Sequence, residues 1–274
     1  MIKTIIQIAD IHIPNDTSKR PYDKMLESFL KQLYNNEIKG KNPDEIRIVI
    51  CGDTFTNKIK TNNEAKAMFH MLLNYLNEMC RTYIIAGNHD MLENNHDRMD
   101  SLNPTFEIEG AYENIIYLDK YLDFKSGYVE DDNVVFALFS MHESFAPTNI
   151  EHSQYPDKKI VGLYHGDVKG AVTDSGRMTD GGIDTSYFAE CDCVMAGHIH
   201  KFQELKKEGV PIVYSGSVFQ QAEDENTTGH GYVVWNVEDM TYRHVEVDND
   251  YRIFKFKIDD YTAFSDDVET LINL

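Results

Sequence analysis

Short apolar runs alternate with amphipathic segments along the first third of the chain. Residues 2–9 form an apolar run that indicates a buried strand, and residues 22–38 carry apolar side chains at helical spacing. The same two patterns recur at residues 46–51 and 64–80, and another apolar run follows at residues 83–86. This order predicts a sheet with helices packed against it.

The middle of the chain consists mainly of strand patterns with few long helices between them. The predicted strands cover residues 115–118, 134–139, 160–165, 193–196, 202–205, 212–214, 232–237 and 241–247. The stretch 166–184 is rich in Gly, Asp, Thr and Ser, which predicts a long loop. A second sheet packed on the first explains these strands best. We therefore expect an α/β fold, a four-layer α/β/β/α sandwich of two mixed β-sheets flanked by helices.

The pattern changes near residue 248. Residues 252–258 alternate like a strand, and Ser265 is a candidate cap for a short helix. Either this helix packs back on the core or the chain continues in a longer parent protein. We expect one large domain over residues 1–247 and the start of a capping or partner-binding segment over residues 248–274.

Composition and charge narrow the class of protein. Apolar residues make up 42% of the 274 residues, enough for a substantial core, and no apolar run of about 18 residues predicts a membrane span. The N-terminus carries no signal peptide pattern, so we expect a cytoplasmic, intracellular protein. The cysteines fit no disulfide framework and are expected to be reduced and buried; they are Cys51, Cys80, Cys191 and Cys193. The formal charge of −20 argues against broad binding along a nucleic-acid backbone, although bound cations would change the sign locally.

Residues that carry chemistry are concentrated in five short segments. They are Asp10-Ile11-His12, Gly52-Asp53, Gly87-Asn88-His89-Asp90, His165-Gly166 and Gly197-His198-Ile199-His200. Most of them follow an apolar run directly, and strand ends in a sheet-based fold point into a shared crevice. Residues two apart on an extended chain face the same side, so the DxH and HxH pairs can each serve one site.

The nitrogen and oxygen side chains in these segments suit a pair of divalent ions. The candidate metal ligands are Asp10, His12, Asp53, Asn88, His165, His198 and His200. Two ions about 3.5 Å apart that share a carboxylate need roughly this many donors plus water. Mixed His and carboxylate donors favour Mn, Fe or Zn over Ca or Mg. No cysteine lies in these segments, which argues against a structural zinc site.

The ordered set of segments resembles the calcineurin-like metallophosphoesterase superfamily, whose pattern is DxH, GD, GNH[DE], H and GHxH. The match covers residues 1–247. Within that superfamily the chain is similar to the SbcD-type DNA double-strand-break repair nucleases. The features that carry this similarity are GNHD rather than GNHE, Phe55 after Gly52-Asp53-Thr54, His165-Gly166 before a long loop, and Tyr214-Ser215-Gly216-Ser217 after GHxH.

The resemblance implies a role for each matched residue. The first ion would be bound by Asp10, His12, Asp53 and His200, and the second by Asp53, Asn88, His165 and His198. The resemblance also implies that His89 protonates the leaving oxygen and that Asp90 orients His89 by a hydrogen bond. Two divalent ions, with Mn²⁺ favoured and Fe or Zn as alternatives, would supply a hydroxide that attacks phosphorus in line.

Several positions lie outside this pattern. Thr56 stands three residues after Asp53, where SbcD-type nucleases usually carry His or Asp, so no role in placing a DNA end carries over to it. The GDxxDRG segment of the Ser/Thr protein phosphatases is absent, which argues against that activity. His142 and His96 are expected to be structural, and the acidic run 223–225 is expected to be a solvated turn.

Two functions, and a third that the sequence disfavours, follow from these observations. The resemblance implies a Mn-dependent exo- or endonuclease subunit that acts on DNA in repair and recombination. Its expected partners are DNA and an SbcC-type ATPase subunit, with a homodimer left open and no membrane. The alternative is a small-molecule phosphodiesterase or phosphatase of the same superfamily, which the acidic charge fits more comfortably. A metal-free scaffold is disfavoured because every donor position is filled.

Overall fold

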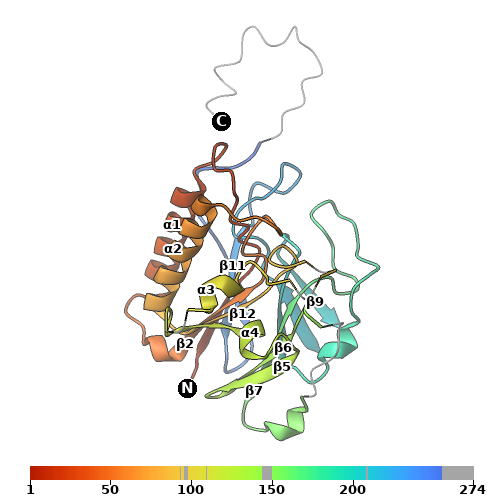
Figure 1. Cartoon of the computed structure of the whole chain (residues 1–274). Coiled ribbons are helices and arrows are strands. Elements are labelled where there is room, and N and C mark those ends of the chain that lie inside the picture. The colour runs from red at the N-terminus through yellow and green to blue at the C-terminus, as the bar shows by residue number, and fades with distance from the viewer. Residues whose placement is uncertain (93, 96–97, 109, 144–149, 208, 255–274) are drawn as a thin grey trace.

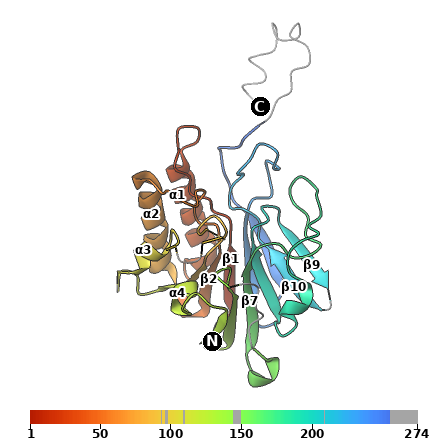
Figure 2. The same ribbon diagram turned by 45° about the vertical axis from the view of Figure 1, so that its right-hand side comes forward.

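Two mixed sheets lie face to face (Figure 2). The long helices cover the outer side of the first sheet, and a short helix packs on the outer side of the second. The structure is a computed structural model, and it describes residues 1–254 except 93, 96–97, 109, 144–149 and 208. Within these residues each sheet has six strands. The prediction of two mixed sheets flanked by helices is therefore confirmed.

The first sheet is parallel in its centre and antiparallel at one edge. Its strand order is β12-β11-β1-β2-β3-β4. The strands are β1 (Thr4–Ile8), β2 (Ile46–Cys51), β3 (Thr82–Ile85), β4 (Ile115–Tyr117), β11 (Gly231–Asn236) and β12 (Tyr242–Glu246). Strands β1 to β4 run parallel, whereas β11 pairs antiparallel with both β1 and β12.

Two amphipathic helices cover the outer face of this sheet (Figure 1). They are α1 (Tyr22–Leu33) and α2 (Asn63–Met79), and the Asn62 side chain caps α2 by accepting a hydrogen bond from the Ala65 amide. A π-helical segment, η1 (Tyr34–Ile38), follows α1, so the helix that we predicted over residues 22–38 is not α-helical throughout. The shorter helical segments on this side are η2 (Pro43–Glu45), α3 (Asn103–Phe106) and α4 (Leu118–Tyr121).

The second sheet has the same mixed design. Its order is β5-β6-β7-β8-β10-β9, with parallel pairing among β6, β7, β8 and β10 and an antiparallel strand at each edge. The strands are β5 (Gly127–Asp131), β6 (Val134–Phe139), β7 (Lys159–His165), β8 (Cys193–Gly197), β9 (Gln203–Lys207) and β10 (Val210–Tyr214). On its outer face, Phe188 of the short helix η4 (Thr185–Phe188) joins an apolar cluster with side chains of the sheet. Another short helix, η3 (His152–Gln154), precedes β7.

The space between the sheets is filled by apolar side chains and closed at one end by an ion pair. Trp235 and Phe136 are fully buried there, and burying a side chain of this size stabilises the fold by roughly 1.5–3 kcal/mol. The Arg47 Nε of β2 lies 2.5 Å from the Asp131 carboxylate of β5, and the Tyr83 hydroxyl donates to the same carboxylate at 2.8 Å. Because Arg47 and Asp131 belong to different sheets, this pair holds the sheets together.

Some elements differ from the sequence-based expectations. Strand β5 was not predicted, because its side chains alternate between half-buried and exposed without an apolar run. Residues 252–254 form no strand, and the remainder of the predicted 252–258 strand and the Ser265 helix lie outside the described residues. The four cysteines are buried and free, as expected. None of the helices within the described ranges combines the length and apolar character that crossing a bilayer requires.

Candidate metal centre

All five predicted segments meet where the carboxyl ends of the parallel strands of both sheets face each other. In the first sheet, Asp10 follows β1, Asp53 follows β2 and Asn88 follows β3. In the second sheet, His165 ends β7 and His198 follows β8. The N-terminus lies at the lower end of β1 in Figure 2, so these carboxyl ends lie at the upper end. Seven donors that are scattered along the sequence therefore converge between two sheets.

Four of these residues have left-handed backbone conformations that non-glycine residues rarely adopt. The φ angles are 51° at Asp10, 51° at His12, 52° at Asp53 and 101° at His198. Hydrogen bonds between the segments hold this geometry: the His12 amide donates to the Asp53 carbonyl at 2.9 Å, and the His198 amide donates to the Asp10 carboxylate at 3.0 Å. Backbone strain of this kind clusters at functional sites, where the surrounding structure over-determines it.

The approach of the two sheets requires glycine beside the donors. A Cβ atom on Gly52, whose φ is +84°, would lie 2.4 Å from the His165 Nδ1. A Cβ atom on Gly197 would lie 2.0 Å from the Cys51 carbonyl oxygen. Any side chain at these positions would push the strand ends apart, so the glycines set the close spacing of the donors.

One group of donors gathers around His12. Donor atoms of Asp10, His12 and His200 all lie within 4.8 Å of one another. The His12 Nε2 lies 3.0 Å from the His200 Nε2 and 3.5 Å from the Asp53 Oδ2. This is the set of residues that we expected to hold the first ion.

A second group gathers around His165. Donor atoms of Asp53, His165 and His198 also lie within 4.8 Å of one another. The His165 Nε2 lies 3.3 Å from the Asp53 Oδ1 and 3.1 Å from the Asn88 Oδ1, and the His198 Nδ1 lies 2.9 Å from the same amide oxygen. Asp53 presents one oxygen to each group, as a carboxylate shared by two ions must.

The chemistry of the donors fits divalent cations. The His165 Nδ1 lies 2.7 Å from the Cys51 carbonyl, and the His200 Nδ1 lies 2.7 Å from the Glu225 carboxylate. In the neutral rings the proton therefore sits on Nδ1. The Nε2 lone pair of His165 then points toward Asp53 and Asn88, and that of His200 points toward the His12 Nε2. Facing acceptors repel one another unless protons or cations lie between them. A pair of divalent ions resolves this repulsion for both groups.

Burial shifts the pKa of several donors toward the uncharged form. It raises the pKa of the Asp10 carboxyl to about 6. It lowers the pKa of His12 to about 3 and that of His198 to about 4. Burial disfavours the charged form of each group, so these two rings are neutral and able to donate a lone pair near neutral pH.

Carboxylates reverse this trend at the other two rings. Burial would lower the pKa of His165, but the neighbouring Asp53 carboxylate raises it to about 9. Burial would also lower the pKa of His200, but Glu225 and Asp10 raise it to about 9. In turn, His165 and His12 hold the pKa of Asp53 well below its usual range, although burial alone would raise it. The site thus favours positive charge at its centre even without metal.

The surroundings of His89 differ from the expectation. Its ring Nδ1 lies 2.7 Å from the Thr56 carbonyl oxygen, and its amide donates to the Asp53 Oδ1 at 2.7 Å. The Asp90 carboxylate instead accepts hydrogen bonds from the backbone amides of Thr54, Phe55 and Gly87. The prediction that Asp90 accepts a hydrogen bond from His89 is therefore wrong. Asp90 holds the strand-end loops together, because it is fully buried and already saturated by amides.

Glu225 is a site residue that the sequence did not reveal. We expected the acidic run 223–225 to be solvated, but Glu225 is 9% exposed and bonded to His200. Its neighbours Glu223 and Asp224 are exposed, as expected. No local pattern separates Glu225 from two residues of the same type, so only the fold identifies it.

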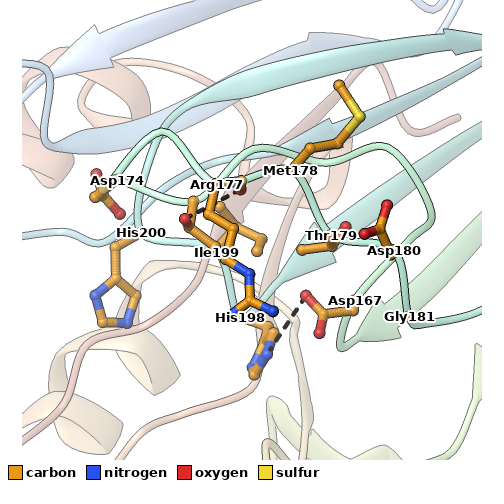
Figure 3. A pocket seen from close by; sticks show the side chains of 11 residues that line it. Asp167, Asp174, Arg177, Met178, Thr179, Asp180, Gly181, His198, Ile199 and His200 are labelled. Atoms are coloured by element: carbon orange, nitrogen blue, oxygen red, sulfur yellow. Dashed lines mark hydrogen bonds and ion pairs between the residues drawn. The ribbon is translucent and has the colours of Figure 1, made fainter.

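A cavity of about 420 Å³ adjoins the two donor groups (Figure 3). Much of its wall comes from the loop between β7 and η4, whose length was expected but whose side chains were not assigned a role. The lining residues are Asp167, Thr173, Asp174, Arg177, Met178, Thr179, Asp180, Gly181, His198, Ile199 and His200. Of the other histidines, His142 is buried beside Asp100, whereas His96 lies outside the described residues.

Proteins similar to this chain include one viral relative and several solved structures. The chain is 32% identical over 271 residues to the uncharacterized protein R555 of Acanthamoeba polyphaga mimivirus. The match covers 94% of this chain, but the chain spans only 19% of the length of that protein. Solved structures with a similar fold include a novel archaeal phosphodiesterase, with a TM-score of 0.43, 12% identity, and coverage of 88% of this chain and 98% of the other. Another is Vps29 with Zn²⁺ from Entamoeba histolytica, with a TM-score of 0.40, 13% identity, and coverage of 87% and 88%. At these scores neither structure bears on the substrate.

A family match covers most of the chain. The model of the calcineurin-like phosphoesterase superfamily domain matches residues 4–240, which include all seven donors and His89. The chain therefore belongs to the calcineurin-like phosphoesterase superfamily.

Proposed function

We propose that this metallophosphoesterase is a DNA nuclease of the SbcD type that hydrolyses phosphodiester bonds with two divalent ions, Mn²⁺ being the favoured metal. The observation that carries the proposal is the position of Asp53, which faces one donor group with each carboxylate oxygen while its Oδ1 accepts from the His89 amide. This arrangement would set a proton donor beside the phosphate that two ions hold.

When bound, the two ions would activate water and neutralise the negative charge that builds on the phosphate. Two bound divalent ions would bring four positive charges, and the Asp10 and Asp53 carboxylates would offset only two of them, so the loaded site would be cationic. This surplus attracts a phosphodiester even though the whole chain is acidic.

His89 would supply the proton for the leaving oxygen. Its Nδ1 lies 2.7 Å from the Thr56 carbonyl, so the Nδ1 proton is engaged and the Nε2 proton is the one available for transfer. The ring also contacts the His12 ring edge-on, with 4.9 Å between centroids, which holds it beside the first donor group. His89 is half-buried, so a substrate can reach it.

The SbcD-type assignment rests on the GNHD segment, Phe55 and the Tyr214-Ser215-Gly216-Ser217 segment. It brings an SbcC-type ATPase as the proposed partner and makes residues 248–274 the proposed start of a capping or partner-binding segment. The related viral protein is about five times longer than the matched region, since the match spans 19% of it.

A second candidate is a small-molecule phosphodiesterase or phosphatase. The charge of −20 and the cavity of about 420 Å³ favour it, because cavities of this size suit small ligands and an acidic surface repels DNA at long range.

A substrate panel separates the two candidates. The chain would be incubated with Mn²⁺, Zn²⁺ or Fe²⁺ and with hairpin DNA, single-stranded DNA, cyclic nucleotides, bis-p-nitrophenyl phosphate and p-nitrophenyl phosphate. We expect cleavage of DNA and of the diester, with His89→Ala as the inactive control. Turnover of the small esters with DNA left intact under every metal would reject the nuclease and favour the second candidate.

A further inference from the structure

The loop between β7 and η4 is held in a defined shape against the second sheet. Its backbone forms isolated bridges between Val168 and Ile183 and between Val172 and Met178. The Gln203 side chain of β9 clamps it, because it accepts from the Val172 amide at 2.8 Å and donates to the Val172 carbonyl at 2.8 Å. The loop backbone is therefore tied to the second sheet, and the exposed Arg177 side chain projects from it at the cavity.

Among the described side chains that line this cavity, Arg177 carries the sole positive charge apart from the histidines. Figure 3 shows its side chain reaching from the loop toward His198 and Asp167. Within the described part of the chain the guanidinium has no carboxylate within ion-pair distance, although Asp167, Asp174 and Asp180 line the same cavity. A guanidinium that is not neutralised by nearby carboxylates is available to an anionic ligand.

The His198 ring lies between Asn88 of the second donor group and Asp167 of the cavity wall. The His198 Nδ1 faces the Asn88 amide oxygen at 2.9 Å, whereas its Nε2 faces the Asp167 Oδ1 at 3.8 Å on the cavity side. A phosphate held by the ions would thus lie next to the cavity, with the His198 ring between the two. The next unit of a polymeric substrate would enter the cavity, while a substrate with one phosphate would leave the Arg177 end empty.

We propose that Arg177 is a specificity-determining residue that binds the phosphate next to the scissile one in a polynucleotide. This inference rests on the proposed nuclease function and deepens it. The aspartates of the cavity repel phosphate, so the guanidinium is the group there that can hold an anion, and their oxygens can accept hydrogen bonds from sugar and base groups. Recognition would then require at least two successive phosphates.

The first test compares Arg177→Ala with Lys169→Ala on two substrates. Lys169 is exposed on the same loop and does not line the cavity, so its variant removes the same charge without the contact. We expect Arg177→Ala to lower the kcat/KM of the Mn²⁺-loaded protein for an oligonucleotide by about 10- to 100-fold. This is the range expected for the loss of a hydrogen bond to a charged group. The rate on bis-p-nitrophenyl phosphate should change less than about twofold, and both ions should remain bound by elemental analysis.

The second test removes the charge from the substrate. A methylphosphonate placed one linkage from the scissile bond should slow the wild type as much as Arg177→Ala does and should not slow Arg177→Ala further. An unchanged oligonucleotide rate in Arg177→Ala would overturn the inference while leaving the nuclease function standing. Equal losses on both substrates would also overturn it, because they would assign Arg177 to the scissile phosphate. A wild type that cleaves the diester but no oligonucleotide would overturn both proposals.

Discussion

Four donor residues at the candidate metal centre have strained backbone conformations that place their side chains close together. Left-handed conformations at Asp10, His12, Asp53 and His198 each cost on the order of 1–3 kcal/mol, and hydrogen bonds between segments keep them in place. The neighbouring His89 has an ordinary backbone conformation and is not one of the seven donors, so replacing its side chain removes an edge-on contact with the His12 ring but no ligand.

The first prediction concerns His89→Ala. We expect kcat to fall by about 10²–10⁴-fold while both ions stay bound, because the ring would act on the leaving oxygen and holds no metal. Elemental analysis and single-turnover rates measure the two effects separately. His70→Ala, which changes an exposed ring on α2, serves as the control and should leave both unchanged. Near-wild-type turnover of the His89 variant would refute the acid role.

The second prediction concerns Glu225→Gln. The substitution leaves a partner for the His200 Nδ1 but removes the charge that orients and polarises the ring, so we expect roughly 10–100-fold weaker binding of one ion. Isothermal titration with Mn²⁺ measures this affinity. Asp224→Asn removes the same charge from an exposed neighbour and should bind both ions normally. Equal affinities in the two variants would show that Glu225 has no part in the site.

Among the elements, apolar periodicity predicts those that bury a continuous face and misses those that do not. The runs 46–51 and 134–139 coincide with β2 and β6 because every residue in both strands is buried. The edge strand β5 has no such run, and the π-helical turn η1 continues the spacing of α1. Edge and junction elements depend on tertiary contacts that a local pattern does not contain.

One such contact, between Asp131 of β5 and Arg47 of β2, gives the third prediction. We expect Asp131→Asn to lower the free energy of unfolding by about 3 kcal/mol, because it leaves a buried guanidinium unpaired. Urea denaturation measures this change. Asp132→Asn, whose partner is the exposed N-terminus, should cost less than about 0.5 kcal/mol. A similar loss in both variants would mean that the pair does not join the sheets.

The same contact predicts a direction for acid sensitivity. Burial would raise the pKa of Asp131, but Arg47 and Tyr83 outweigh it and hold the pKa below its ordinary value of 3.8. A carboxyl whose pKa falls on folding stabilises the protein above its unfolded pKa, and this contribution is lost as pH drops through the folded value. The difference in unfolding free energy between wild type and Asp131→Asn should therefore be constant from neutral pH down to about 5 and shrink below about 4. A difference that is independent of pH down to the acid transition would contradict this account.

At the scale of the whole molecule, the sequence predicts the donor set but not its supporting groups. Donors such as Asn88 and His165 can be predicted from the sequence for two reasons. They follow or end apolar runs that form strands, whose carboxyl ends meet at one place, and Asn and His are residue types that bind metals. Glu225, Arg177 and the Thr56 carbonyl are not, since their roles come from loops that fold back over the site. The prediction for Asp90 was wrong for the same reason, because two of its three amide partners, Thr54 and Phe55, follow a different strand.

The acidic surface yields a further prediction, on the salt dependence of DNA cleavage. If binding of DNA depends on the metal centre and Arg177 rather than on a basic surface, few counterions are released on binding. A plot of log kcat/KM against log salt concentration, taken between about 50 and 200 mM, should have a slope no steeper than about −2. Arg177→Ala should make the slope shallower by about one. A steep wild-type slope would indicate an extended basic contact that the described residues do not provide.

At the candidate metal centre, binding of divalent cations should also release protons from the histidine donors. Without metal, His165 and His200 carry protons at pH 7, since carboxylates raise the pKa of both to about 9 against the effect of burial. Cation uptake must expel them, so about two protons should leave per chain, and apparent affinity should strengthen as pH increases toward 9. Calorimetry in buffers of different ionisation enthalpy counts these protons directly. Acidification would then act as a chelator does, releasing the cations while leaving the sandwich folded.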